Sequence, residues 1–344
     1  MSPTQLTVPH SAPTLGDEEA AAVDKVLRSG AIAQGGEVAA LETECAAFSG
    51  HTFGVALSSG TAALHMALAA LGVKPGDPVG APSYACAALA TAIRLQGAIP
   101  FLFDAGEDFN PDLSTVPEPP IPSIGVHLFG KKAPQPKSGF AIDDVAQSFG
   151  GATGNQSPVS VTSFYATKLM TTGEGGMLLT NDEEVAGFAR DRRDYDNRDT
   201  FVDRFNYKMT DFQAAMGRVQ LRRLPGFIAR RRAIATQYTD AFADLPLRLP
   251  DGEGHVYFRY VVSTEDRADL ENHLQARGIA AKRPVHMPSH RYFQGTSGEE
   301  NVKLLNRYPG AEAAHRSALS LPIYPSMIEA QIRHVIESTL DFFR

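Results

Sequence analysis

Between about residues 53 and 180, short apolar runs alternate with stretches of helical periodicity. Strands are indicated for "FGVALSS", "GDPVGAPS", "AIPFLFD", "PSIGVHLFG", "GFAIDDVA", "VSVTSFYA" and "GGMLLTND", and helices for "GTAALHMALAALG" and "ACAALATAIRLQG". The first of these helices is apolar on nearly all sides, which is typical of a buried helix. Strands that alternate with helices of this length predict an α/β fold, with a mostly parallel sheet covered on both faces.

The chain outside this region is organised differently. Residues 17–49 predict two helices, and residues 211–245 predict a long helix pair broken near Pro225, because proline interrupts helical hydrogen bonding. The tail that follows alternates strand and helix. We therefore expect a large domain over residues 1–225, including the N-terminal helical segment, and a smaller C-terminal α+β domain over residues 226–344.

Composition restricts the classes of function. The 344 residues carry a formal net charge of -7, which argues against nucleic acid as the main partner, because phosphate binding needs a basic footprint. The two cysteines, Cys45 and Cys86, are too few for a disulfide framework, a multi-cysteine metal site or a four-thiolate iron–sulfur cluster. No signal-peptide pattern and no run of about 18 apolar residues is visible. We expect a cytoplasmic protein without a membrane partner.

Four stretches that follow predicted strands contain residues capable of chemistry, and ligands of open α/β sheets gather at such strand ends. The first places Ser59, Gly60 and Thr61 at a helix start, where free N–H groups can bind a phosphate; the alternative is an N-capped helix. The second places Asp143 and Asp144 after a strand, and only one of these adjacent carboxylates can face a site. That carboxylate would pair with a cationic ring nitrogen or with Mg²⁺, and the alternative is again an N-cap.

The third stretch, "SFYATKLMTTGEGG", sets Ser163 five residues before a lone lysine, Lys168. Ser163 can reach a phosphate, and a lysine whose pKa is lowered by desolvation or by a nearby cation can attack an aldehyde; the alternative is a solvated surface lysine. The fourth, "RFNYKMTDF", presents Asn206 before an aromatic residue and a cation; the alternative is a helix entry with Thr210 as N-cap. This order of features indicates pyridoxal 5'-phosphate (PLP), whose ring nitrogen needs a carboxylate and whose aldehyde needs a lysine.

Over nearly its whole length the sequence resembles the DegT/DnrJ/EryC1/StrS family of sugar aminotransferases, a branch of the fold type I PLP-dependent enzymes. The resemblance rests on "LRSGAIAQGGEVAALE", "SSGTAAL", "IDDVAQSFGG", "SFYATK", "GEGGMLLTND", "FNYKMTDFQAAMG" and "LSLPIYPSM". It implies a large domain with a mostly parallel seven-stranded sheet between helices, plus the smaller C-terminal α+β domain. It also implies that PLP, cycling with its pyridoxamine form (PMP), is the cofactor.

The resemblance assigns roles to individual residues. Lys168 matches the lysine that forms a Schiff base with the cofactor, and Asp144 matches the partner of the pyridine nitrogen, so both are candidate catalytic residues. Asn206 matches an asparagine that reaches the phosphate across a dimer interface, which implies a homodimer with shared active sites. The other cofactor-binding residues implied are Gly60, Thr61 and the backbone N–H of Ala62 in the phosphate turn, Ser163 at the phosphate, and Gln147 at the ring hydroxyl.

Two positions depart from the family pattern. Cys86 stands where the family usually has an aromatic residue against the cofactor ring, and a thiol stacks poorly. Lys208 stands in place of an arginine, so it keeps the charge but loses the bidentate fork for a nucleotide-sugar phosphate. On the substrate side the resemblance also implies Tyr165 and His286. His286 and His290 have metal-ligand spacing, but the proline between them breaks any helix, and we expect no metal.

The activity implied is a PLP-dependent transfer of an amino group from L-glutamate, or glutamine, to a keto-sugar that is nucleotide-linked, in amino-sugar biosynthesis. Three alternatives stand beside it. Close relatives aminate keto-cyclitols instead. Sugar dehydratases of the family replace the lysine by histidine, so Lys168 argues against dehydration. A regulatory or ligand-binding protein without turnover would not need the intact lysine, acid and phosphate set.

Overall fold

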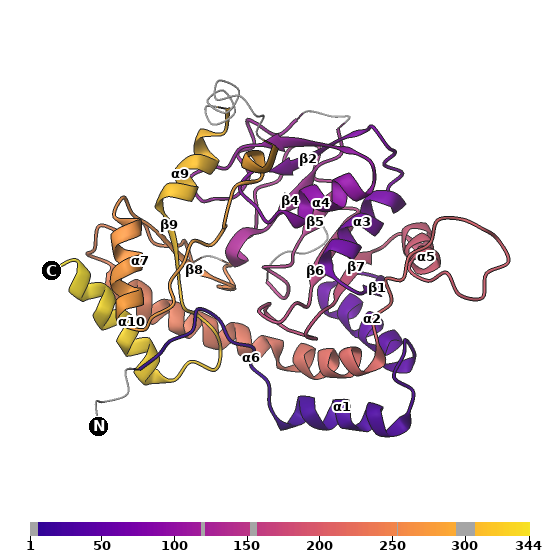
Figure 1. The fold of residues 1–344 in the computed structure, drawn as a ribbon, viewed down its shortest axis with the longest axis horizontal. Coiled ribbons are helices and arrows are strands. Elements are labelled where there is room, and N and C mark those ends of the chain that lie inside the picture. The colour runs from indigo at the N-terminus through magenta and orange to yellow at the C-terminus, as the bar shows by residue number, and fades with distance from the viewer. Residues whose placement is uncertain (1–5, 118–120, 152–156, 253, 294–306) are drawn as a thin grey trace.

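The computed structural model describes residues 6–117, 121–151, 157–252, 254–293 and 307–344. In Figure 1 a sheet with its covering helices forms one part of the molecule, and helices and strands from the C-terminal region form a second part. The long helix α6 (Asp211–Phe242) extends from the first part into the second.

The first part alternates strands and helices, as the apolar pattern predicts. Its elements are α1 (Asp17–Ser29), α2 (Gly36–Ser49), β1 (Phe53–Leu57), α3 (Gly60–Ala70), β2 (Pro78–Pro82), α4 (Ala88–Leu95), β3 (Ile99–Phe103), β4 (Ile124–Val126), η1 (Leu128–Gly130), β5 (Ile142–Asp144), β6 (Val159–Ser163), β7 (Gly176–Thr180) and α5 (Glu183–Arg192). The main sheet has the order β1-β7-β6-β5-β4. Strand β7 is antiparallel to β1 and β6, whereas β4, β5 and β6 are parallel, so the predicted mostly parallel sheet is confirmed.

The seven strands implied by the resemblance do not form one continuous sheet. The described residues form a five-stranded sheet and a separate parallel pair, β2 with β3. Within the described ranges the two meet at a single bridge, where Gly80 N donates to Pro122 O at 2.8 Å. Prolines explain the interruption, because β2 begins at Pro78 and ends at Pro82, and a proline has no N–H with which to extend a ladder.

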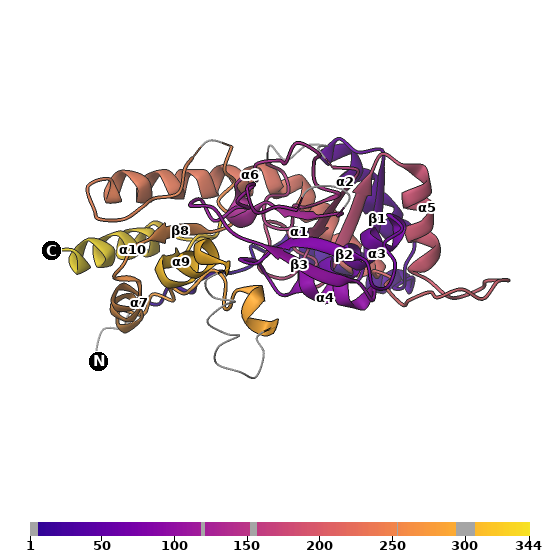
Figure 2. The same ribbon diagram turned by 90° about the horizontal axis from the view of Figure 1, so that it is seen from above.

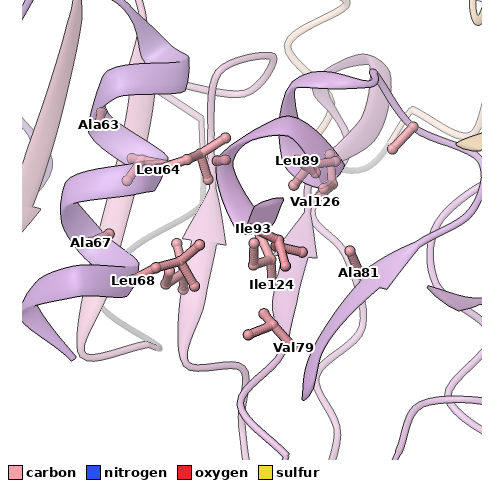
Figure 3. Close-up of a cluster of buried hydrophobic side chains, with 14 of the residues drawn as sticks. Ala63, Leu64, Ala67, Leu68, Val79, Ala81, Leu89, Ile93, Ile124 and Val126 are labelled. Carbon is pink, nitrogen blue, oxygen red and sulfur yellow. The ribbon is translucent and has the colours of Figure 1, made fainter. Parts of the chain in front are cut away.

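Apolar side chains of α3 and α4 fill the space against the sheet. Leu64 and Leu68 of α3, together with Ile93 of α4, lie beside Ile124 and Val126 of β4 (Figure 3), and all five are buried. Full burial of an aliphatic side chain of this size stabilises the fold by about 1.5–3 kcal/mol. This core therefore fixes the start of α3 relative to the strand ends.

Helix α6 is one helix of 32 residues, so the prediction of a helix pair broken near Pro225 is wrong. Pro225 cannot donate to the carbonyl four residues earlier, but neighbouring helices hold α6 on both sides of it. On one side Arg223 pairs with Glu19 of α1 at 2.6 Å. On the other, Arg230 pairs with Glu329 at the start of α10 at 2.8 Å. Tertiary packing thus overrides the local helix-breaking signal.

The C-terminal part has a core of its own around the second half of α6, where Tyr238 and Tyr260 are buried. Val8 also packs into this core and bridges to Ile279, so the extended segment before α1 joins the C-terminal part. The division between residues 225 and 226 stays a prediction, and α6 runs through it. The elements here are β8 (Tyr260–Ser263), α7 (Arg267–Ala276), η2 (Ser289–Phe293), α9 (Pro309–Ser317), β9 (Ala318–Leu321) and α10 (Glu329–Phe342).

Candidate active site

A cavity of about 490 Å³ lies where the carboxyl ends of β5 and β6 meet the start of α3, and the C-terminal part completes its wall. The structure gathers here nine residues that are far apart in the sequence and were predicted to act together. They are Gly60, Thr61, Cys86, Asp144, Gln147, Ser163, Tyr165, Lys168 and His286.

The start of α3 forms one end of the cavity. Ser59 is the N-cap, and its side chain accepts a hydrogen bond from Ala62 N at 3.1 Å, so the capping interpretation is correct. The Ala62 N–H predicted to bind a phosphate is therefore engaged with Ser59 here, and Ala62 itself is buried. Gly60 lies against β6, since a Cβ added to it would be 2.8 Å from Ser163 Cβ. The absence of a side chain at Gly60 is what lets the helix start and Ser163 share this end of the cavity.

The two adjacent aspartates face opposite sides of β5. Asp143 is fully buried away from the cavity, 3.2 Å from His127 Nε2, and it accepts a hydrogen bond from Gln135 Nε2 at 3.1 Å. Asp144 lines the cavity, and its Oδ1 accepts a hydrogen bond from Ala146 N at 2.9 Å. Burial raises the pKa of Asp144, and the charge of Lys168 opposes that shift. Asp144 is therefore the carboxylate that is available to a cationic ring nitrogen.

Lys168 is not a solvated surface lysine. Its Nζ lies 5.2 Å from the centroid of the Phe258 ring, inside the cavity wall. Burial lowers its pKa and Arg259 lowers it further, whereas Asp144 and Cys86 act in the opposite direction. A lowered pKa increases the fraction of neutral amine, which is the form that attacks an aldehyde.

Other predicted residues have defined positions around the lysine. Gln147 lines the cavity and accepts a hydrogen bond from Phe129 N at 2.8 Å, so its side chain is held in place. Ser163 Oγ accepts a hydrogen bond from Tyr165 N at 3.3 Å. The Tyr165 side chain is 47% exposed, which places it at the open side of the cavity.

Asn206 and Lys208 lie outside this cavity. Asn206 is exposed, at the base of the segment between α5 and α6 whose outer part projects from the body of the molecule in Figure 2. The next residue, Tyr207, is held against the body, because its carbonyl accepts a hydrogen bond from Ser58 N at 2.8 Å. Lys208 is on the same segment, and its Nζ donates to Asp194 at 2.7 Å and to Asp196 at 3.0 Å. Within one chain, therefore, neither side chain contributes to the cavity that contains Lys168.

His286 and His290 have separate environments. His286 lines the cavity, whereas His290 is buried behind it, with its Nδ1 2.5 Å from Ser83 Oγ and its Nε2 2.9 Å from Glu312 Oε1. Both ring nitrogens of His290 are thus occupied by protein groups. In the part of the chain that the structure describes, no three His, Cys, Asp or Glu side chains are grouped so as to hold a metal ion.

Part of the cavity wall comes from residues that the sequence patterns did not indicate. Phe258 and Arg259, directly before β8, line the cavity, as do Met287 and Tyr292 from the segment that carries His286. The stretch "HVYFRYVV" contained a usable signal, because an arginine inside an apolar strand-like run is a charge that the fold must bury or assign to a ligand.

These groups fit PLP. A helix start with hydroxyl groups lies at one end, a buried carboxylate stands at the strand end beside it, and the amine of Lys168 lies in the same cavity. The Gly60 position leaves space at the phosphate end that any side chain would fill. The donor set thus matches the three handles of the cofactor, namely its phosphate, ring nitrogen and aldehyde.

Comparison with known proteins decides the family. The profile of the DegT/DnrJ/EryC1/StrS aminotransferase family matches residues 13–340. The chain belongs to this family. Being a DegT/DnrJ/EryC1/StrS protein, it is a PLP-dependent sugar aminotransferase, and solved structures with the same fold include PLP and PMP forms.

Individual relatives cover most of the chain. It is 33% identical to dTDP-3-amino-3,4,6-trideoxy-alpha-D-glucose transaminase from Streptomyces venezuelae, over 94% of this chain and 92% of the relative. It is 31% identical to the pleiotropic regulatory protein of Geobacillus stearothermophilus, over 94% of this chain and 93% of the relative. The solved structure of S. venezuelae DesV superposes with a TM-score of 0.86 at 30% identity, covering 95% of this chain and 94% of DesV.

A family of sugar aminotransferases places this protein in amino-sugar biosynthesis. Among the described helices, none is long and apolar enough to cross a membrane.

Proposed function

We propose that the protein transfers an amino group from L-glutamate, or glutamine, to a keto-sugar linked to a nucleoside diphosphate, using PLP and PMP. The observation that carries this proposal is the presence of Lys168 and Asp144 in one cavity, beside a helix start that can hold a phosphate. The nucleotide is inferred from relatives that are named for dTDP-, GDP- or UDP-linked sugars. The bound cofactor would supply an electron sink for the carbanion formed at the donor's α-carbon.

Lys168 has two tasks in this proposal. Its neutral amine would hold the cofactor covalently at the aldehyde carbon, with loss of the carbonyl oxygen as water, when no amino donor is present. Once an amino donor has released it, the same amine would take a proton from the donor's α-carbon as general base and give that proton up again as general acid. The lowered pKa of Lys168 suits both tasks, because it increases the fraction of neutral amine that can accept a proton and later return it.

The remaining groups orient the cofactor. Asp144 keeps the ring nitrogen protonated, and Gln147 contacts the ring hydroxyl. Thr61 and Ser163 bind the phosphate with the first turn of α3, where backbone N–H groups have no helical partner. Cys86 lines the same cavity and would offer the cofactor ring a small apolar contact in place of aromatic stacking.

We further propose a homodimer in which each subunit completes the cavity of the other. Asn206 is exposed and Lys208 is half-buried, at the base of the segment between α5 and α6, and neither lines the cavity of its own chain. A second subunit would bring Asn206 to the cofactor phosphate and Lys208 to the substrate. Tyr165 and His286, at the cavity wall, face the sugar.

The dimer has a direct test by mixing two inactive variants. Lys168→Ala and Asn206→Ala are coexpressed, so that mixed dimers contain one cavity with both native residues. If Asn206 acts across the interface, activity returns to about a quarter of the wild-type value, from half of the dimers with one working site each. No recovery in mixed dimers means that Asn206 does not act in trans.

The amino transfer is tested by the absorbance of the bound cofactor. L-Glutamate converts the wild-type protein from the PLP to the PMP spectrum, and Lys168→Ala slows this step by about 10²–10⁴-fold or more. Lys74→Ala, which removes an exposed lysine, is the matched control and retains the wild-type rate. Conversion of Lys168→Ala at the wild-type rate contradicts the proposal.

The acceptor is identified by the reverse colour change. Keto-sugars linked to dTDP, GDP or UDP are screened against the PMP form beside free keto-cyclitols, and the true acceptor restores the PLP spectrum. If only keto-cyclitols restore the PLP spectrum, the acceptor is a keto-cyclitol and not a nucleotide-linked keto-sugar. A cofactor spectrum that no amino donor changes favours the regulatory or ligand-binding alternative.

A further inference from the structure

Arg259 is a largely buried cation in the cavity wall that no carboxylate of the described residues neutralises. Its side-chain hydrogen bonds, within the described ranges, run from Nη1 to the His10 ring, at 3.0 Å from Nε2 and 3.2 Å from Nδ1. Burial lowers its pKa to about 10, so the guanidinium still carries its charge at neutral pH. A buried charge without an opposite charge is unfavourable unless a ligand completes it.

A second buried arginine nearby shows what a purely structural role looks like. Arg231 of α6 donates from Nη1 to three backbone carbonyls, those of Tyr257, Phe258 and Ile323, at 2.8 to 3.2 Å. These bonds hold the segment that leads into Arg259. The Nη1 of Arg231 is therefore fully engaged by the backbone, although its Nε has no partner among the described residues, whereas Arg259 lines the cavity.

His10 supports Arg259 without competing with it. Burial, together with the charges of Arg259 and Lys282, lowers the pKa of His10 to about 2, so the imidazole is neutral and accepts from Nη1. Its Nε2 is also 2.9 Å from Ser320 Oγ, which fixes the ring. Arg259 is thus positioned by a neutral imidazole, which does not neutralise the positive charge of the guanidinium.

Arg259 and the reactive lysine flank the same aromatic ring. The Lys168 Nζ is 5.2 Å from the centroid of the Phe258 ring, and the Arg259 Cζ is 5.0 Å from that centroid. Arg259 is also close enough for its charge to lower the pKa of Lys168. An amino acid whose nitrogen takes the position of the Lys168 amine would therefore present its carboxylates inside the cavity that Arg259 also lines. The planar guanidinium fork matches a carboxylate, which it can bind with two parallel hydrogen bonds.

We propose that Arg259 is the receptor for a carboxylate group of the amino donor. This inference rests on the proposed function, because it presumes that an amino acid enters the cavity and replaces Lys168 at the cofactor. It adds a binding residue for the donor that is separate from the cofactor-binding set. The diphosphate of the sugar acceptor is the other anion that a guanidinium can bind. The experiment below distinguishes binding of the donor carboxylate from binding of this diphosphate.

The test measures binding as well as turnover. Glutarate, a dicarboxylate without an amine, is titrated into the PLP-loaded protein by calorimetry, and dTDP is titrated in a parallel series. Arg259→Gln weakens glutarate binding by about 10- to 100-fold, the range for a lost hydrogen-bonded charge pair, and leaves dTDP binding unchanged. Arg248→Gln, which removes an exposed arginine that stacks on Phe109 at 5.0 Å outside this cavity, leaves both affinities unchanged.

Several outcomes overturn the inference. The inference fails if Arg259→Gln binds glutarate with wild-type affinity. It also fails if Arg259→Gln loses affinity for dTDP alone, which would assign Arg259 to the acceptor. If Arg259→Gln fails to retain PLP, Arg259→Lys decides: it keeps the charge but not the fork, and it is expected to bind glutarate about tenfold more weakly than wild type. If Arg259→Lys binds glutarate as tightly as the wild type does, bidentate binding of the carboxylate by the guanidinium is rejected.

Failure of the proposed function gives a different result. In that case no amino donor converts the wild-type cofactor spectrum, whatever glutarate does. When conversion occurs, the donor series locates the contact: an equal rise of KM for L-glutamate and L-glutamine in Arg259→Gln indicates the α-carboxylate. A rise for L-glutamate alone indicates the side-chain carboxylate.

Discussion

Replacing Gly60 by alanine would insert a methyl group between the first turn of α3 and the end of β6. That carbon would lie 2.8 Å from Ser163 Cβ and 3.3 Å from Ser163 Oγ. Non-bonded carbon atoms attract best at about 3.5–4.0 Å, so the two elements must separate by roughly 0.7 Å or more. The separation would open the end of the cavity where the cofactor phosphate is expected to bind.

The magnitude follows from the cost of overpacking, which is about 1–3 kcal/mol for an added methyl group in a well-packed site. If the cavity end absorbs this strain, the dissociation constant of PLP rises by about 5- to 150-fold. Titration of the apoprotein with PLP, followed by absorbance, measures the change. A dissociation constant for Gly60→Ala within twofold of the wild-type value would refute the reasoning.

Gly226→Ala is the matched control for Gly60→Ala. A Cβ at Gly226 meets nothing within 4 Å, and the residue lies inside α6. The substitution should leave PLP affinity unchanged and raise the free energy of unfolding by about 0.5–1 kcal/mol, because glycine is less favourable than alanine inside a helix.

Three further predictions concern protonation and stability. The pH at which the apoprotein half-maximally captures PLP, trapped by borohydride, should lie below the ordinary lysine pKa of about 10.4, because burial lowers the pKa of Lys168. Asp144→Asn should lower this pH again, because Asp144 opposes that shift; a rise would reject the assigned pair. Burial lowers the pKa of His255 to about 4, so its stability contribution is complete above the unfolded pKa of about 6.5 and is lost as the pH falls toward 4. Urea unfolding at pH 5 should show about 2 kcal/mol less stability from this group than at pH 7.5, and His255→Asn should remove that part of the pH dependence; an unchanged pH profile speaks against it. Asp211 accepts three backbone N–H groups at the start of α2, at 2.8 to 3.3 Å, so Asp211→Ala should lower the unfolding free energy by about 3 kcal/mol and Asp211→Asn by less, since an amide oxygen keeps part of the set. Equal losses in the two variants would show that the charge, not the acceptor geometry, is responsible.

The centre of the site was predictable because its information is local. Gly60, Asp144 and Lys168 each lie at the end of a strand or within five residues after it, and parallel strands bring such positions to one edge of the sheet. Their positions relative to the predicted strands were therefore enough to predict that these three residues lie close together. The choice between Asp143 and Asp144 was also open to prediction in part, since adjacent strand residues face opposite sides.

The parts that could not be predicted depend on contacts between distant segments. Pro225 predicts a helix end, yet Leu224 and Ile228, buried in one apolar core on either side of it, hold α6 as a single helix. The sequence predicts that Lys208 is a cation that binds the substrate, yet in this chain its amine is paired with Asp194 and Asp196. The role of Arg259 depends on which groups surround the guanidinium, and one of these, His10, is about 250 residues away in the sequence.

The continuity of α6 has a mechanical consequence. The helix contributes side chains to the cores of both parts, so neither part can rotate against the other unless α6 bends. The backbone resists bending least where a helical hydrogen bond is missing, and that place is the turn before Pro225. The turn before Pro225 is thus the position where α6 bends most easily in any motion that widens or narrows the cavity between the two parts.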